Sequence, residues 1–284
     1  MQFIEKEHPM IKPSSGYPLK IGGLLVLIGA ILLIDQYLKT GWLTLTVPML
    51  VGFILLAAGA LYRRLGWAVA GCLVSGVGAG GFLAFSPLLE GKLPNQIGYF
   101  LAAFGMGWML IVLVSHVISG STAWWALIPA SVITASGAAM LFTPLRVVDF
   151  TLYILVGLGA AFLVWGLAAK LFGLIIPGCL LVTIGVGIYL AWASTNGQNS
   201  LARTGIMLVS FAFGWGLITL FSRRVTPRFL WWPLIPGGML AMVGWGLYLS
   251  GNPDNAINFI GNTGSVGLIL FGLYLLLLRR GIQQ

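Results

Sequence analysis

Residues 171–193 read LFGLIIPGCLLVTIGVGIYLAWA, an unbroken apolar run without a charged side chain. At a rise of 1.5 Å per residue, a helix of roughly 20 residues crosses the hydrocarbon core of a bilayer. One run of this kind also suits a helix buried in the core of a soluble protein. What decides between the two is whether such runs recur along the chain.

Apolar runs of this length recur from one end of the chain to the other. We predict helices near residues 20–38, 43–62, 66–85, 97–116, 124–142, 149–169, 171–193, 203–222, 230–250 and 257–278. The connections between them are short, so neighbouring helices are expected to be antiparallel. The predicted fold class is all-α: a polytopic membrane protein with about ten transmembrane helices. Residues 1–18 are predicted to form a polar cytoplasmic N-terminal tail, and residues 19–284 a single transmembrane domain.

Composition supports a membrane protein. Of the 284 residues, 59% are hydrophobic and only 7% are charged, against roughly 25% charged residues in a soluble domain. A soluble protein this apolar could not cover its surface with polar groups, whereas a lipid-facing surface needs none. The chain also contains 40 glycines, and small residues allow membrane helices to approach closely.

The positive charges predict the orientation, because cytoplasmic connections of membrane proteins are enriched in Lys and Arg. With both termini in the cytoplasm, the inner side carries Lys6, Lys12, Lys20, Arg63, Arg64, Lys170, Arg223, Arg224, Arg228, Arg279 and Arg280. The outer side carries Lys39, Lys92, Arg146 and Arg203. This asymmetry explains the net charge of +9 without a nucleic-acid partner, and contact with anionic lipid headgroups accompanies it.

The chain is similar to itself at a fixed offset. WWALIP at 124–129 returns as WWPLIP at 231–236, and GWMLI at 107–111 returns as GWGLI at 214–218. Cys72 and Cys179 have the same separation as the starts of these paired segments. One offset shared by unrelated residue types indicates internal duplication. We refer to this separation as the repeat offset.

A shorter period lies within the repeat offset. The mid-helix glycines Gly29, Gly78, Gly137, Gly185 and Gly244 have spacings that alternate between a shorter and a longer value. We interpret the unit as a helical hairpin present five times, at about 19–64, 65–116, 123–170, 171–224 and 229–280. Every unit starts on the same side of the membrane, so the repeats are parallel, unlike the inverted repeats of many secondary transporters.

Glycines two positions apart recur at helix centres. The pairs are Gly78 and Gly80, Gly105 and Gly107, Gly157 and Gly159, Gly185 and Gly187, Gly214 and Gly216, and Gly244 and Gly246. Two positions correspond to about 200° of helical rotation, so each pair thins opposite sides of its helix. We expect close neighbours on both sides, in a layered or ring-like array of helices.

The first hairpin resembles a known family. Residues 21–29 (IGGLLVLIG) with 32–35 (LLID), and then 48–50 (PML) with 59–64 (GALYRR), are similar to the small transmembrane hairpin domain of LiaF-type cell-envelope stress proteins. The last hairpin shares the pattern, with WPL at 232–234, GLY at 272–274 and Arg279-Arg280. The resemblance implies a multi-pass protein of the bacterial plasma membrane and supplies no catalytic residues. The chain lacks the soluble domain that follows the hairpins in those regulators, which argues against a signalling role.

Ionisable residues inside a membrane are functional candidates by default. Here Asp35, Arg146 and Asp149 fall at outer helix ends, Lys170 at an inner turn, and His116 at the inner end of its helix. We interpret all five as interfacial anchors, with His116 the best candidate for a titrating group. Arg146 and Asp149 are spaced to form an ion pair across one turn.

No residue is assigned a catalytic, cofactor-binding or metal-binding role. The chain has two histidines and two cysteines, and neither a nucleophile–base pair nor a metal-ligand motif is recognisable. We therefore expect a non-enzyme without a cofactor: a structural or accessory subunit of a membrane complex, or an envelope organiser. The alternative is a transporter or channel for a neutral or apolar solute, and a membrane-embedded enzyme is the least favoured interpretation. The expected partners are the lipid bilayer and other membrane-protein subunits.

Overall fold

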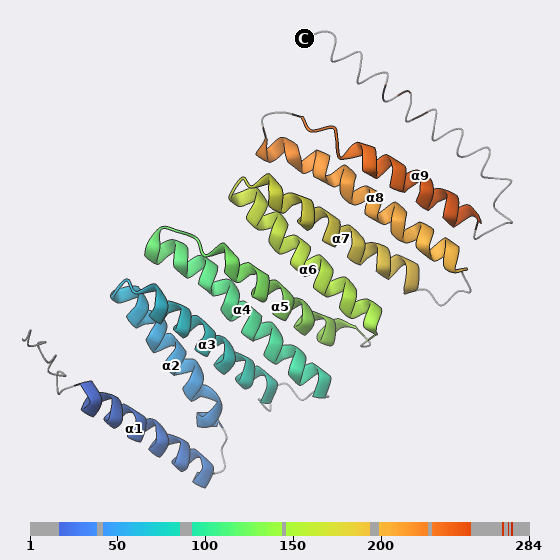
Figure 1. The fold of residues 1–284 in the computed structure, drawn as a ribbon. Helices are drawn as coiled ribbons and strands as arrows, with labels where there is room; N and C mark the ends of the chain where they lie inside the picture. Colours follow the sequence, from blue (N-terminus) through green and yellow to red (C-terminus); the bar gives the residue numbers. More distant parts are fainter. Residues whose placement is uncertain are drawn as a thin grey trace, which may run out of the picture.

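The computed structural model describes residues 17–38, 42–85, 93–143, 146–193, 199–226 and 229–250, with isolated positions 269, 272 and 274. These residues form a succession of helices and contain no strand (Figure 1). The elements are α1 (Tyr17–Leu38), α2 (Trp42–Leu61), α3 (Leu65–Phe85), α4 (Leu93–Ser119), the 3-10 helix η1 (Trp124–Ala126), α5 (Leu127–Phe142), α6 (Val147–Ala168), α7 (Phe172–Trp192), α8 (Ser200–Val225) and α9 (Leu234–Ser250).

The helices match the segments predicted from hydropathy. Each of the first nine predicted segments is helical, with closely similar ends. The tenth, near 257–278, lies outside the described residues apart from the three isolated positions, and the tail at 1–18 lies almost wholly outside them.

Seven of the described helical segments are long and apolar enough to cross a membrane: α2 to α4, the continuous η1–α5 segment, and α6 to α8. Helix α9 is also apolar but shorter. Length and composition therefore make the chain a multi-pass membrane protein.

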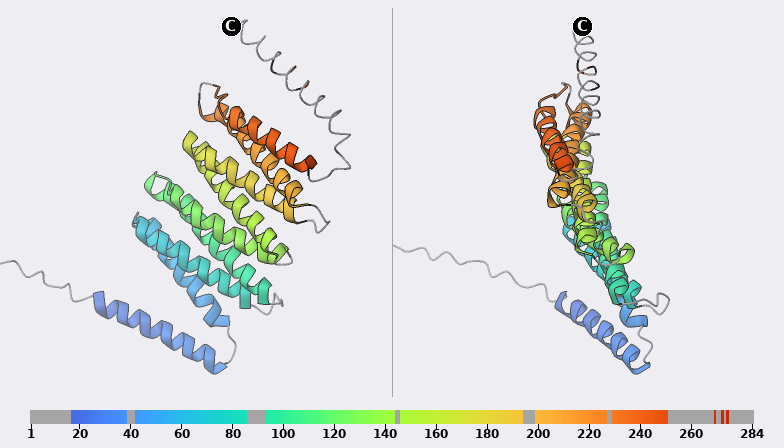
Figure 2. Two further views of the ribbon diagram at one scale, coloured as in Figure 1. Left: turned by 45° about the vertical axis from the view of Figure 1, so that its right-hand side comes forward. Right: turned by 90° about the vertical axis from the view of Figure 1, so that its right-hand side faces the viewer.

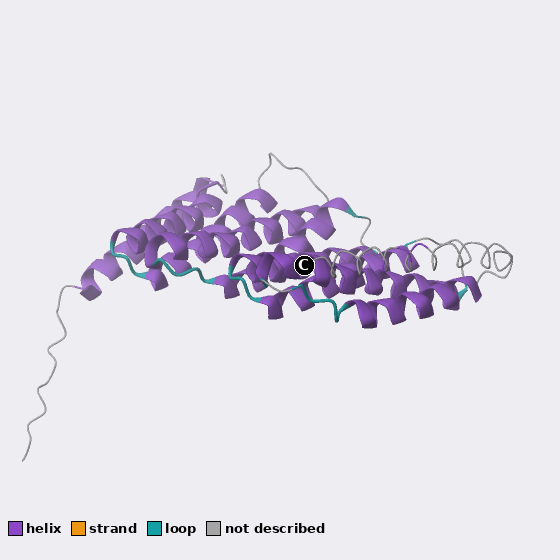
Figure 3. Ribbon diagram, turned by 90° about the horizontal axis from the view of Figure 1, so that it is seen from above, coloured by secondary structure: helices purple, strands orange, loops and turns teal. Residues whose placement is uncertain are grey.

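The helices stand side by side in a single row that follows the order of the chain (Figures 1 and 2). Extensive packing among the described elements joins each helix only to the ones before and after it. The array is narrow when turned edge-on (Figure 2) and elongated when seen from above (Figure 3). The row has two looser junctions, between α5 and α6 and, loosest of all, between α1 and α2.

Glycines set the close approach of α2 to α3 and of α6 to α7. A Cβ atom at Gly52 or Gly78 would overlap the backbone of the facing helix. In the α6–α7 contact, a Cβ at Gly159 would lie 2.8 Å from the carbonyl oxygen of Gly178. The glycines of the first contact are Gly52, Gly59, Gly71 and Gly78, and those of the second are Gly159, Gly166, Gly178 and Gly185. The two sets are related, position by position, by the repeat offset.

Most of the glycine pairs have the predicted role. In α4, a Cβ at Gly105 would meet Thr134 of α5, whereas a Cβ at Gly107 would meet Cys72 of α3. The pairs in α3, α6 and α7 likewise face both of their neighbours. In α8 and α9 only the first glycine of each pair faces a helix, and Gly216 and Gly246 border open space.

Two tight turns join these closely packed helices. Arg63 and Lys170 adopt left-handed backbone conformations, with φ of 48° and 53°. Around Arg63, the amide of Arg64 donates to the carbonyl of Gly59 (3.0 Å) and the amide of Arg63 to that of Ala60 (3.3 Å). This is the Schellman pattern that satisfies the last carbonyls of a helix. The turn at Lys170 has the matching long bond, from the Leu171 amide to the Gly166 carbonyl (2.8 Å).

The packed interior consists of two small clusters rather than one core. One contains Cys72 of α3 and Ile111 of α4, with Leu56 of α2 packed against it. The other contains Cys179 of α7 and Ile218 of α8, with Leu163 of α6 against it. The first cluster extends from α2 to α6 and the second from α6 to α8, and the members named here are again related by the repeat offset.

Candidate functional site

Asp35 is buried, which the sequence did not predict. Its side chain is 1% exposed, although it lies near the end of a helix. It accepts hydrogen bonds from the backbone N–H of Thr44 (2.7 Å) and from the Thr44 hydroxyl. Thr44 lies in the first turn of α2, where unpaired amides and the helix dipole favour a negative group. Asp35 therefore ties the end of α1 to the start of α2, at the loosest junction of the row.

Arg146 and Asp149 form the predicted ion pair. The Nε of Arg146 lies 2.9 Å from a carboxylate oxygen of Asp149, and a terminal nitrogen of Arg146 also donates to the carbonyl of Ala193. The hydrogen bond to Asp149, and then the charge of that carboxylate, raises the pKa of Arg146 above its ordinary value. Asp149 itself is 2% exposed, in the first turn of α6. Each of the two buried carboxylates among the described residues therefore lies in, or accepts a hydrogen bond from, the first turn of a helix.

His116 lies in the last turn of α4, as predicted, and its Nδ1 is 3.1 Å from the hydroxyl of Thr122. This contact is exposed and joins the helix to the turn that follows. Lys170 occupies the tight turn between α6 and α7. Neither residue forms an ion pair with a second titratable group in the described chain, so no acid–base pair is assembled around them.

The hydroxyl groups bond mainly to their own helices. Ser75 donates to the carbonyl of Cys72, Ser131 to that of Ile128, and Thr183 to that of Cys179. Thr134 and Thr219 have buried hydroxyl oxygens without a hydrogen-bond partner. These groups do not line up as a continuous polar track, because most of them are satisfied locally.

Two edge-to-face aromatic contacts join the middle of α4 and of α8 to the segments that precede α5 and α9. Trp108 meets Trp125 edge to face with ring centroids 6.0 Å apart, and Trp215 meets Trp232 in the same way at 6.0 Å. The buried indole nitrogens of Trp108 and Trp215 have no hydrogen-bond partner. An edge-to-face arrangement brings a ring edge to the negative face of its neighbour, which is where an indole N–H can interact weakly.

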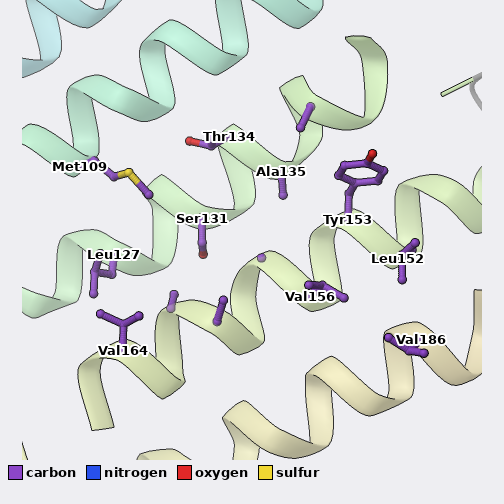
Figure 4. Close-up of a pocket in the computed structure, with 14 residues that line it drawn as sticks. Met109, Leu127, Ser131, Thr134, Ala135, Leu152, Tyr153, Val156, Val164 and Val186 are labelled. Atoms are coloured by element: carbon purple, nitrogen blue, oxygen red, sulfur yellow. The ribbon is translucent and has the colours of Figure 1, made fainter. Parts of the chain in front are cut away.

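A hollow lies between α5 and α6, at the looser junction in the middle of the row (Figure 4). It has a volume of about 650 Å³ and is open to the outside. Its walls are almost entirely apolar. The residues that line it are Met109 of α4, Leu127, Ser131, Thr134, Ala135 and Ala138 of α5, Leu152, Tyr153, Val156, Gly157, Ala160, Ala161 and Val164 of α6, and Val186 of α7. We refer to this feature as the α5–α6 groove.

Small side chains produce the groove. Where the two helices come closest, a Cβ at Gly157 would lie 2.9 Å from the Cβ of Ala135. Around this point Ala138 and Ala160 leave space that larger residues would fill, and Met109 and Val186 stand on either side. The sequence shows these small residues but predicts close packing from them. Whether these residues give a close contact or a groove depends on how far α5 and α6 diverge on either side of the contact between Gly157 and Ala135.

The described residues contain no group of three or more His, Cys, Asp or Glu side chains that could hold a metal ion. Cys72 and Cys179 are free, buried and located in separate clusters. The chain matches no protein-family model, no curated protein sequence and no solved structure. The features of the molecule that bear on its function are the row of helices, its buried carboxylates and the α5–α6 groove.

Proposed function

We propose that this chain is a non-catalytic integral membrane protein that serves as a structural or accessory subunit of a membrane complex, or as an organiser of the cell envelope. The observation that carries the proposal is the single row of helices. A pathway for a solute has to be enclosed on all sides, and one row encloses nothing by itself. A row instead presents broad side surfaces that other membrane proteins can cover.

These side surfaces carry large apolar side chains. In α4 Met106 is 61% exposed, and its counterpart in α8, Phe213, is 70% exposed. Leu113 and Leu220 are a second exposed pair on the same two helices. Such residues suit contact with lipid and with the apolar surface of a neighbouring subunit, where van der Waals packing provides the attraction.

The charged groups support a structural role. Asp35 and Asp149 are already engaged with the starts of α2 and α6. A charge-coupled transporter needs carboxylates in the middle of the membrane that can gain and lose a proton or an ion. In the described helices the acidic side chains stand at helix ends instead.

We also propose that the chain contains a duplicated four-helix unit, α2–α5 followed by α6–α9. The glycine contacts, the turns at Arg63 and Lys170, the tryptophan pairs and the two clusters around Cys72 and Cys179 all share the repeat offset. The looser junctions fall at the start of each unit, before α2 and before α6. The finer division into five parallel hairpins stays a prediction.

The orientation belongs to the same proposal. Successive helices are antiparallel, so Arg63, Arg64, Lys170, Arg223 and Arg224 share one end of the row. We assign this end to the cytoplasm, because basic residues are retained there. The start of α1 then also lies in the cytoplasm, and the predicted tenth helix would bring the C-terminus back to the same side. A location in the bacterial plasma membrane, and the kinship with LiaF-type proteins, remain proposals based on the first and last hairpins.

Purification of the full-length protein from native membranes in a mild detergent tests the accessory role. Mass spectrometry of the eluted material is expected to show one membrane protein in a constant ratio to this chain. Membranes from cells without the affinity tag serve as the control. Elution of this chain alone, with its helical fold verified by circular dichroism, would contradict the proposal.

The α5–α6 groove favours one alternative, a transporter for a neutral or apolar solute. If this alternative is correct, the purified protein reconstituted in liposomes will accelerate the flux of a small apolar fluorescent solute. The double variant Ala138→Leu/Ala160→Leu, which fills the groove, will abolish the acceleration. Flux equal to that of protein-free liposomes would exclude the alternative for the solutes tested.

A further inference from the structure

We propose that the α5–α6 groove binds one acyl chain of a bilayer phospholipid. The inference adds a ligand site to the accessory role and does not depend on that role. It rests on the shape of the groove, on the chemistry of its walls and on its position among membrane-spanning helices.

The groove has the shape of an extended chain. Its lining residues follow one stripe on each helix, from Leu127 to Ala138 on α5 and from Leu152 to Val164 on α6. Each stripe covers about three turns, a length of roughly 17 Å. Because the stripes follow the helix axes, the groove runs in the same direction as the acyl chains of the bilayer.

The groove is too narrow for a protein helix to enter. Gly157 and Ala135, both in its lining, meet across it, and a Cβ added at Gly157 would lie 2.9 Å from the Cβ of Ala135. A helix with its side chains is about 10 Å wide, so a helix from a second copy or another subunit could cover the groove without entering it. An acyl chain is much thinner than a helix, so it can lie inside.

The chemistry of the walls disfavours polar occupants. Three lining residues carry a hydroxyl group: Ser131, Thr134 and Tyr153. Ser131 already donates its hydroxyl hydrogen to the carbonyl of Ile128, and the unpartnered hydroxyl oxygen of Thr134 is buried against Gly105 of α4. The exposed surface of the lining is almost wholly apolar. A polar solute would lose its hydrogen bonds to water there, at a cost of several kcal/mol per group. Apolar cavities also stay free of water. The medium beside these helices is hydrocarbon, so a lipid acyl chain is both available and compatible.

Larger side chains fill two other contacts of the row. Between α2 and α4, Leu56 and Ile111 pack over Cys72, and between α6 and α8, Leu163 and Ile218 pack with Cys179. At the α5–α6 junction alanine and glycine take the place of such residues. An unfilled space of this size would forfeit many dispersion contacts, which an acyl chain restores.

The test uses the full-length protein, reconstituted in vesicles of palmitoyl-oleoyl phosphatidylethanolamine and phosphatidylglycerol and then extracted into detergent. Native mass spectrometry counts the phospholipids retained as detergent washing proceeds. The wild type is expected to keep one phospholipid after the others are removed. Ala138→Leu/Ala160→Leu is expected to lose it together with the rest.

The matched control is Gly173→Leu/Gly216→Leu, which adds side chains of the same size where a Cβ would meet no atom within 4 Å. This variant is expected to keep the phospholipid. If the groove-filling variant retains phospholipid as the wild type does, or if the wild type retains none, the proposal is wrong.

A second measurement covers the case in which the groove-filling variant does not fold. A photoreactive side chain is introduced at Ala160, which is exposed and lines the groove, and is activated after the same detergent washing. The expected product is this chain with one phospholipid attached. Products that contain only detergent, a second copy of the chain or another protein would contradict the proposal.

Discussion

Arg63 and Lys170 hold a backbone conformation that costs an L-residue roughly 1–2 kcal/mol, and both do so in the short turn before the next helix. Glycine normally occupies this position in a Schellman turn. The positive charge offers a reason for the exception, since a cation beside the last carbonyls of a helix interacts favourably with its dipole. The same residues also add to the positive charge of one end of the row.

Replacing Arg63 by glycine therefore separates backbone strain from charge. Arg63→Gly is expected to raise the free energy of unfolding by about 1 kcal/mol, because glycine adopts positive φ without a penalty. Arg64→Gly removes the same charge at a position with ordinary φ. It is expected to lower the free energy of unfolding by up to about 1 kcal/mol, because glycine loses more conformational freedom on folding. Chemical unfolding of both variants in the same detergent provides the measurement. A change of the same sign in both would show that charge, and not φ, dominates.

A second prediction concerns two glycines on α3. Gly78→Ala is expected to lower the free energy of unfolding by about 1–3 kcal/mol, because the added Cβ would overlap the backbone of Met49, which cannot rotate away. Gly81→Ala adds the same methyl group where nothing lies within 4 Å. It is expected to raise the free energy of unfolding by up to about 1 kcal/mol, because alanine favours the helix more than glycine does. The pair is compared by thermal unfolding in detergent. Equal stability of the two variants would rule out the tight α2–α3 contact.

The sequence reveals some of these residue-level features and hides others. The ion pair of Arg146 and Asp149 follows from their i,i+3 spacing at one helix end, which local geometry determines. The burial of Asp35 does not follow, because it depends on the direction in which α2 leaves the connection after α1. Asp35 and Thr44 meet across that connection.

At the scale of elements, helix positions were predictable because apolar length is a strong signal in a membrane. The glycine pairs also predicted the contacts of α3, α4, α6 and α7 on both sides. The α5–α6 groove was not predictable in this way. Gly157 and Ala161 on α6 resemble a close-packing stripe, and only the angle between the helices decides whether they give a contact or a groove.

The junction of α1 and α2 gives the prediction at this scale. Asp35→Ala removes the acceptor for the first turn of α2, a loss of about 1 kcal/mol for a helix cap, and should speed amide exchange there about fivefold. Asp149→Ala is the control, because it removes an equally buried carboxylate from the start of α6. Hydrogen–deuterium exchange should show faster exchange in α2 for the first variant and in α6 for the second. No change in α2 on loss of Asp35 would mean that its carboxylate does not hold the junction.

For the whole molecule, the sequence left the arrangement of the helices open between layers and a ring. The row arises because each helix uses two nearly opposite sides for its neighbours. Repeated along the chain, these two-sided contacts give an elongated band (Figure 3). The band depends on many contacts at once, and no single motif encodes it.

The orientation can be tested by labelling from outside intact cells with a thiol reagent that does not cross membranes. Ser121→Cys, at the end of the row that also holds Arg63 and Lys170, is expected to stay unlabelled. Ser200→Cys, at the opposite end, is expected to react. The native cysteines are buried in the clusters and should contribute no background. Labelling of Ser121→Cys alone would reverse the proposed orientation.

The central claim, that the row serves as a surface for another membrane protein, is tested most directly by photo-crosslinking in native membranes. Photoreactive side chains replace Val77, Leu113 and Leu220, which are exposed on α3, α4 and α8. We expect at least two of these positions to capture one and the same protein, the partner that co-elutes with the chain. Adducts with phospholipid alone at all three positions, in protein that remains folded, would contradict it.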